Sequence, residues 1–136
     1  MKFNICILPT SVHTQAFAEI AESICWALQR LGHDVLFLDK LQLSEPDRRN
    51  IIFGLRPGDA IGSYAPPDTI IYNCEQVTVD GLWPSLVETY KRFTVWDYSA
   101  ANVRRLRVLG CDHVRHCRVG YHESLAIVPP APLAGE

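Results

Sequence analysis

The sequence lacks the features that would place it among membrane or strongly charged proteins. No apolar run in the 136 residues approaches the ~20 that cross a bilayer, so no membrane span is expected. Lys plus Arg (13) nearly balance Asp plus Glu (15), and the net charge of −2 gives no overall field for nucleic acid or an anionic membrane. The first residues run straight into a strand pattern without a separate signal-peptide core. We therefore expect a cytoplasmic protein that does not bind nucleic acid.

Phosphate-binding sequences are also missing. The segment Pro9–His13, which follows the first predicted strand, holds none of the glycines that let backbone approach a pyrophosphate. There is no GxxxxGK[ST] loop, and Asp39 after the second predicted strand is a weak ribose ligand without a glycine loop. The first strand also lacks a terminal acidic pair that could hold a metal in a phosphate-receiver domain. A dinucleotide-dependent dehydrogenase is therefore not expected, and no cofactor is predicted.

The five cysteines are odd in number and widely scattered, which favours free thiols in a reducing compartment over a disulfide framework. One cluster superficially suggests zinc: Cys111, His113, His116 and Cys117. On a strand, residues 113 and 117 face one side and 116 the other, so the four side chains cannot converge. No metal site is predicted. The other interpretation, a metal or redox module, would require the protein to contain a stoichiometric amount of zinc.

Hydrophobic periodicity predicts an α/β fold. A strand over Phe3–Leu8, an amphipathic helix over Phe17–Leu31 and a strand over Asp34–Leu38 form a βαβ unit, with Ser11 or Thr14 as helix cap and Gly32 as its stop. Further strands are predicted over 50–55, 69–73, 93–96 and 113–119, and helices over 84–92 and 99–110. A short helical turn is expected over 43–49 and a mobile loop over 56–68. Together these predict a Rossmann-like, open, mostly parallel sheet of about six strands with helices on both faces.

The same pattern gives the domain organisation. Residues 1–127 are predicted to form one Rossmann-like domain, which is long enough to bury a core. Residues 128–136 hold three prolines without periodicity, and we interpret them as a Pro-rich tail or a truncated interdomain linker.

Polar clusters follow four of the predicted strands, over 10–14, 73–76, 97–102 and 120–123. In parallel sheets, ligands bind outside the carboxyl ends of the strands. His13 in the first such loop could accept a proton from a hydroxyl group, although a surface histidine is the plainer interpretation. The carboxylates Glu75 and Asp97 are predicted at the same edge. Ser99 as N-cap, with Asn102 in a capping-box pairing, explains two polar residues without any function.

Three arginines lie on the predicted helix over 99–110: Arg104, Arg105 and Arg107. They could meet a phosphate or a partner domain. A run of charges on a helix is more often a solvated face, and this interpretation is favoured.

Ordered motifs between residues 50 and 122 resemble the N-terminal half of bacterial glycosyltransferases of the GT-B arrangement, which have two Rossmann-like domains. The motifs are Asn50-Ile-Ile-Phe-Gly54, Thr69-Ile-Ile-Tyr-Asn-Cys-Glu-Gln76, Val95-Trp-Asp-Tyr-Ser-x-x-Asn102 and Val119-Gly-Tyr121. The resemblance implies an acceptor-binding domain. In such enzymes the nucleotide-sugar donor is held mainly by a C-terminal domain, so these residues alone are expected to be inactive.

The resemblance also implies roles for the polar edge. In an inverting enzyme a side chain of this domain would deprotonate the acceptor hydroxyl, and His13, Glu75 and Asp97 are unranked candidates; a retaining enzyme would not need this base. The residues that would shape the acceptor pocket are Thr10, Ser11, Asn73, Tyr98, Asn102 and Tyr121. The acceptor is expected to be a hydroxyl compound or a glycan. The alternative is a stand-alone interaction or regulatory module that kept the fold.

Overall fold

The computed structural model describes residues 1–8, 14–38, 47–78 and 84–122. Within them, the strands are β1 (Lys2–Ile7), β2 (Asp34–Leu38), β3 (Arg49–Phe53), β4 (Ile70–Asn73), β5 (Thr94–Asp97) and β6 (Val114–His116). The helices are the 3₁₀ turn η1 (Thr14–Phe17), α1 (Ala18–Arg30), α2 (Ile61–Tyr64), α3 (Pro84–Arg92) and α4 (Ala100–Val108).

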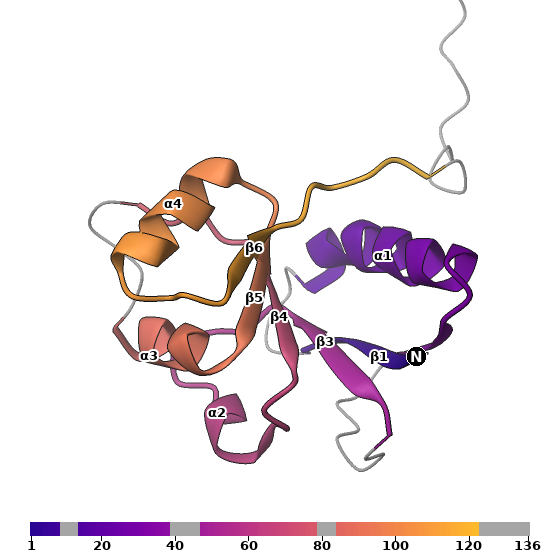
Figure 1. Cartoon of the computed structure of the whole chain (residues 1–136), viewed down its shortest axis with the longest axis horizontal. Coiled ribbons are helices and arrows are strands. Elements are labelled where there is room, and N and C mark those ends of the chain that lie inside the picture. The colour runs from indigo at the N-terminus through magenta and orange to yellow at the C-terminus, as the bar shows by residue number, and fades with distance from the viewer. Residues whose placement is uncertain (9–13, 39–46, 79–83, 123–136) are drawn as a thin grey trace, which may run out of the picture.

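The six strands form one open sheet in the order β2-β1-β3-β4-β5-β6, and every neighbouring pair is parallel. Helix α1 covers one face, while α2, α3 and α4 cover the other (Figure 1). The predicted Rossmann-like α/β fold, with helices on both faces, is confirmed. Because all strands are parallel, their carboxyl ends lie along one edge of the sheet.

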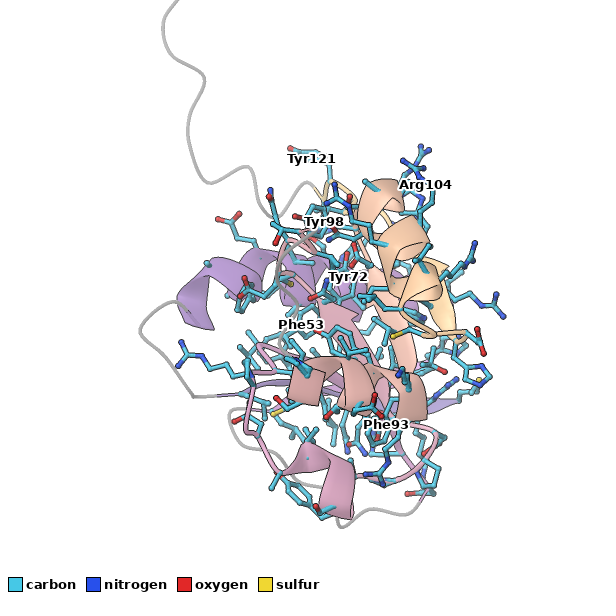
Figure 2. All side chains as sticks on the ribbon, turned by 90° about the vertical axis from the view of Figure 1, so that its left-hand side faces the viewer. Phe53, Tyr72, Phe93, Tyr98, Arg104 and Tyr121 are labelled. Carbon is cyan, nitrogen blue, oxygen red and sulfur yellow. The ribbon has the colours of Figure 1, made fainter. Side chains whose placement is uncertain are left out.

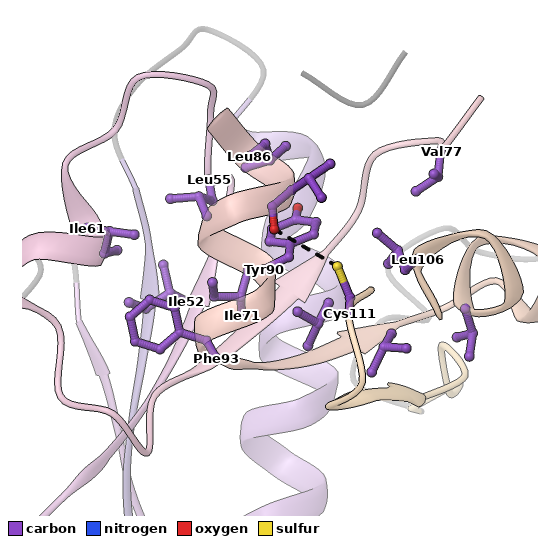
Figure 3. Packing of buried hydrophobic residues seen from close by; sticks show 14 of the residues in the cluster. Ile52, Leu55, Ile61, Ile71, Val77, Leu86, Tyr90, Phe93, Leu106 and Cys111 are labelled. Carbon is purple, nitrogen blue, oxygen red and sulfur yellow. Dashed lines mark hydrogen bonds between the residues drawn. The ribbon is translucent and has the colours of Figure 1, made fainter. Parts of the chain in front are cut away.

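Alternating strand residues feed two separate hydrophobic layers. Ile51, Phe53 and Tyr72 point to the α1 side and pack with α1 residues such as Ala21. Ile52, which lies between Ile51 and Phe53, points to the other side with Ile71, Val95 and Val114. There the core is completed by Leu86 and Tyr90 of α3, Leu106 of α4 and Ile61 of α2 (Figure 3). The middle of the sheet is therefore apolar on both faces.

Glycines with positive φ end several elements where predicted. Gly32 (φ 81°) follows α1, and its N–H donates to the carbonyl of Gln29. Gly110 (φ 87°) follows α4 in the same way, with a bond to the carbonyl of Arg107. In contrast, the residue at the N-cap of α1 is Phe17, without a side-chain hydrogen bond, and η1 leads into the helix there. A cap of α1 by Thr14 is therefore wrong, and Ser11 lies outside the described residues.

Three predicted segments differ from the structure. The segment 56–68 is not wholly a loop, because Ile61–Tyr64 forms α2 and Ile61 is buried in the core. The helical turn over 43–49 is wrong at its end, where Arg49 belongs to β3; residues 43–46 lie outside the described ranges. The last strand spans Val114–His116 rather than 113–119. Its partner β5 ends at Asp97, so a longer β6 would have nothing to pair with.

Beyond β6 the described chain turns toward α1. The hydroxyl of Tyr72 donates to the carbonyl of Cys117 at 2.9 Å, which ties this segment to the sheet. Farther along, the buried His122 ring packs against Trp26 of α1, and the Arg30 guanidinium lies 4.8 Å from the Trp26 ring centroid. The predicted division between residues 1–127 and 128–136 falls outside the described residues. No helix of the described chain is long and apolar enough to cross a membrane.

Candidate functional site

The carboxyl ends of β4 and β5 bring together two residues of the predicted site. Asn73 and Asp97 are the last residues of their strands and face each other in register. The Asn73 amide donates to the Asp97 carboxylate at 2.6 Å, and both side chains are buried. Parallel pairing places the two strand ends side by side, although 24 residues separate them in the chain.

Asn73 connects three segments. Its amide nitrogen also donates to the carbonyl of Glu75 at 2.9 Å. Its side-chain oxygen accepts from the backbone N–H of Glu75 and from the hydroxyl of Tyr90, at 3.1 and 2.9 Å. A single amide thus fixes the turn after β4, the α3 helix and the Asp97 carboxylate.

Asp97 starts the turn into α4. Its second carboxylate oxygen accepts the N–H of Ser99 at 2.7 Å, and the Ser99 hydroxyl accepts the N–H of Asn102 at 3.3 Å. The predicted N-cap at Ser99 is therefore confirmed. A capping box would also require the Asn102 side chain to bind the Ser99 N–H. This half of the prediction is wrong, because the Asp97 carboxylate accepts that N–H instead.

The Asn102 side chain is used across the edge instead. Its amide nitrogen donates to the carbonyl of Glu75 at 3.0 Å, and its oxygen accepts the N–H of Val77 at 3.1 Å. Arg105, one turn along α4, donates to the carbonyl of Val77. The segment after β4 is consequently held on α4 through its backbone.

The electrostatics of this edge are dominated by burial. Desolvation raises the pKa of Asp97 above its ordinary value, and the hydrogen bonds from the Asn73 amide and the Ser99 N–H oppose that shift. Burial raises the pKa of the Cys74 thiol to about 12, with a further contribution from the carboxylates of Glu75 and Asp97. A thiol with this pKa is protonated at neutral pH, so Cys74 is unsuited to act as a nucleophile.

The predicted site residues differ in their access to solvent. The Asp97 side chain is 0% exposed, and the side chains of Asn73 and Asn102 are nearly as buried. All three are therefore enclosed by the fold. Glu75 is exposed and Tyr98 is partly buried, whereas Tyr121 is 78% exposed. In Figure 2, Tyr98 and Tyr121 lie toward one end of the molecule, and Phe93, which precedes β5, lies toward the other. His13, Thr10 and Ser11 lie outside the described residues.

Sequence reasoning missed Tyr90, whose hydroxyl is part of the network. It lies on the apolar face of α3 with Leu86 and Val87, and this spacing identifies it as a core residue without revealing its polar role. Only the buried Asn73 oxygen explains why the position carries a hydroxyl.

The Cys111–Cys117 cluster is divided between the two layers of the fold. Cys111 packs in the layer of α3 and α4, with its thiol 4.0 Å from the carbonyl of Val87, whereas Cys117 packs on the α1 side. The Nε2 atom of His116 lies 3.0 Å from the carbonyl oxygen of Tyr98, within hydrogen-bond distance. Among the described residues, no three His, Cys, Asp or Glu side chains are grouped as a metal ion would require. All five cysteines are free thiols.

Comparison with known proteins adds no assignment to this geometry. No protein-family model matches the chain, and no similar curated protein or solved structure was found.

Proposed function

We propose that this chain is the acceptor-binding N-terminal domain of a bacterial GT-B glycosyltransferase. The observation that carries the proposal is the hydrogen-bonded edge formed by Asn73, Glu75, Asp97 and Asn102. These residues belong to two separate motifs of the resemblance, and the fold joins them at the carboxyl end of the sheet. Parallel α/β sheets bind their ligands at that end.

Within this proposal, buried and exposed residues have different roles. Asn73, Asp97 and Asn102 hold the two turns in place, because their side chains are buried and hydrogen-bonded to one another or to backbone. Glu75 presents an exposed side chain from the turn they hold. Of the candidate bases in the described residues, Glu75 is therefore the one that an acceptor hydroxyl can reach.

Tyr98 and Tyr121 would form the aromatic part of the acceptor site. A sugar ring has an apolar face that packs on an aromatic side chain and hydroxyl groups that need polar partners. The partly buried Tyr98 follows β5 directly, and the exposed Tyr121 follows β6. This arrangement supports a hydroxyl-rich acceptor such as a glycan.

The donor would be bound elsewhere. A nucleotide sugar requires groups that approach its pyrophosphate, and the glycine-rich sequence that serves this purpose after a first strand is missing. We therefore propose that the chain has no transferase activity by itself and requires no cofactor. The prediction of a cytoplasmic location belongs to the same proposal.

Two titrations of the whole 136-residue chain test the proposal. Calorimetry with UDP-glucose and GDP-mannose should give no measurable binding, and tight binding of either would contradict an acceptor-side domain. In parallel, NMR titration with methyl glycosides and disaccharides should shift the backbone signals of Glu75, Tyr98 and Tyr121.

The matched variants are Glu75→Gln and Glu88→Gln. Both remove one exposed carboxylate, but Glu88 lies on α3 and pairs with Lys91. We expect the first substitution to weaken glycoside binding and the second to leave it unchanged. Equal effects of the two variants, or shifts confined to other parts of the chain, would favour the interaction-module alternative.

A further inference from the structure

The two edges of the sheet differ in how well they are protected from other chains. At one edge, β6 has three residues, and Arg115 and His116 among them are exposed. Short length and charge are features that keep an edge strand from pairing with another chain. At the other edge, β2 has the five residues Asp34–Leu38, and its only charged side chain is that of Asp34. The β2 edge therefore lacks the protection of the β6 edge.

The side chains of β2 leave apolar surface open on both faces of the sheet. Val35 is buried on the α1 side, and Phe37 shares that face by alternation along the strand but is 43% exposed. Leu36 lies on the opposite face and is 39% exposed. The charge of Asp34 is at the start of the strand, where its carboxylate accepts from the Arg48 guanidinium at 2.5 Å. The rest of this edge strand is apolar.

The backbone of β2 shows which of its groups are available for pairing. The N–H of Asp34 donates to the carbonyl of Met1 at 3.0 Å, so the backbone groups of Asp34 are directed toward β1. In a parallel pair every second residue is directed toward the neighbouring strand, and the residues between are directed away from it. The N–H and carbonyl groups of Val35 and Phe37 therefore point out of the sheet, and no described residue bonds to them. Such a row of groups is a template for another extended strand.

We propose that β2 pairs in antiparallel fashion with β2 of a second copy of this chain, so that the two sheets join into one. The register that uses all of these outward groups is centred on Leu36. Val35 and Phe37 then lie opposite Phe37 and Val35 of the second copy, and each pair exchanges both of its N–H···O bonds. Leu36 lies opposite its own counterpart on the two-fold axis, at the close spacing of a non-hydrogen-bonded pair. The same surface of each subunit is used, as in most homodimers.

A second copy is the partner that the side chains favour, because β2 is complementary to itself in this register. Apolar side chains meet on both faces, Val35 with Phe37 on the α1 side and Leu36 with its counterpart on the other. The only charges on the paired strands are the two Asp34 carboxylates. Each of them lies opposite Leu38 of the second copy, at opposite ends of the paired segment. Like charges directly opposite each other would destabilise the pair, and this register avoids them.

The pairing also stops at two subunits. The joined sheet has the short, charged β6 strand at each of its outer edges. The carbonyl of Val114 points away from β5, because the neighbouring His113 carbonyl is the one that bonds to Val95, and it already accepts from Arg107 at 3.4 Å. Further growth is therefore disfavoured. Because β1 and β3 lie between β2 and β4, the interface is separate from the candidate site, and the proposal does not depend on the glycosyltransferase assignment.

Analytical ultracentrifugation of the whole chain tests the association. A five-residue edge buries too little surface for a permanent complex, so we expect a reversible dimer. The weight-average mass should rise toward twice the monomer mass as the protein concentration increases from about 10 μM to about 1 mM. A monomer over the whole range, or continued growth beyond a dimer, would overturn the proposal.

Amide hydrogen exchange in the unaltered protein identifies the surface. Raising the concentration should slow the exchange of the Val35 and Phe37 amides, because their N–H groups acquire partners in the dimer. The Leu36 amide is the internal control, since it is already directed toward β1 and should change less. A dimer that formed without this alternation would mean that the copies meet through another surface, which would contradict the proposal.

Charges placed on the two-fold axis test the register. Leu36→Lys and Leu36→Glu each put two like charges directly opposite each other, so each variant alone should dimerise at least about 10-fold more weakly than the wild type. An equimolar mixture of the two should associate again, because a lysine then faces a glutamate. Substitutions that merely unfolded the protein would not give this recovery, and its absence would overturn the register.

Val108→Lys is the matched control for these variants. It also replaces an exposed aliphatic side chain, but Val108 lies on α4, far from the β2 edge. We expect its self-association to equal that of the wild type. If Val108→Lys weakened the dimer as much as the Leu36 variants, association would depend on general surface hydrophobicity rather than on β2.

Discussion

Asp97 combines complete burial with a negative charge that no Lys or Arg of the described chain pairs with. It is stabilised by a neutral amide and a backbone N–H, and those bonds do not fully offset the loss of water around the carboxylate. The folded protein therefore holds the Asp97 proton more tightly than the unfolded chain, whose aspartates titrate near about pH 3.9.

This difference predicts how stability depends on pH. The contribution of Asp97 to the free energy of unfolding is full below about pH 3.9 and falls as pH rises through the raised folded-state pKa. The asparagine side chain of the Asp97→Asn variant does not titrate. The wild type should therefore lose stability relative to Asp97→Asn as pH rises from about 3 to about 7 in urea unfolding. If the wild type instead gained stability over the same pH range, the hydrogen bonds to the Asp97 carboxylate would outweigh its desolvation.

At the scale of elements, the α4 helix is defined by its two ends. Ser99 caps its first turn, and Gly110 ends it with a φ of 87°, a conformation that a residue with a Cβ rarely adopts. After Gly110 the chain runs back to the sheet, where Val114 of β6 pairs with Val95 of β5. The conformation at Gly110 therefore sets where β6 enters the sheet.

Gly110→Ala should destabilise the protein by about 1–2 kcal/mol, because the left-handed conformation strains any residue with a Cβ. The added Cβ would also lie 3.3 Å from the Cε of Lys91. Gly120→Ala is the matched control, since Gly120 has no such φ and no neighbouring atom within 4 Å of its Cβ position. Equal stabilities of the two variants by chemical denaturation would show that Gly110 imposes no constraint.

At the scale of the whole molecule, one sheet separates two hydrophobic layers. Leu106, Tyr90 and Ile61 belong to one layer, and Ala21 and Tyr72 to the other. Both layers draw on alternate residues of the same strands, as Ile51 and Ile52 show. Loss of either layer therefore exposes the sheet that supports the other, and the layers are expected to unfold together.

Leu106→Ala tests this coupling. Leu106 is fully buried, so its truncation should cost about 2–5 kcal/mol. In a Trp83→Phe background the remaining tryptophans are Trp26 on α1 and Trp96, which packs on the α1 side of the sheet. We expect the unfolding midpoints followed by tryptophan fluorescence and by circular dichroism to shift by the same amount, although the mutation lies in the other layer. Fluorescence that stayed at the wild-type midpoint would show two independent units.

Much of the fold follows from local patterns in the sequence. The apolar runs, the helical spacing before Gly32 and the Ser99 cap each depend on residues close together in the chain, so they could be predicted one element at a time. The length of β6 could not, because it depends on where β5 ends. Helix α2 was also missed, since its core residue Ile61 lies among glycines and prolines that favour a loop.

The candidate site was predictable in part for the same reason. The sequence by itself determined that Asn73, Glu75, Asp97 and Asn102 lie at the ends of strands or shortly after them, and that strands of this kind end at a common edge. Tertiary structure alone decided that Asp97 is buried, that Tyr90 reaches Asn73, and that Asn102 bonds to the backbone of Glu75 and Val77. A chain pattern fixes the face of each element, but solvent access and hydrogen-bond partners depend on which elements pack beside it.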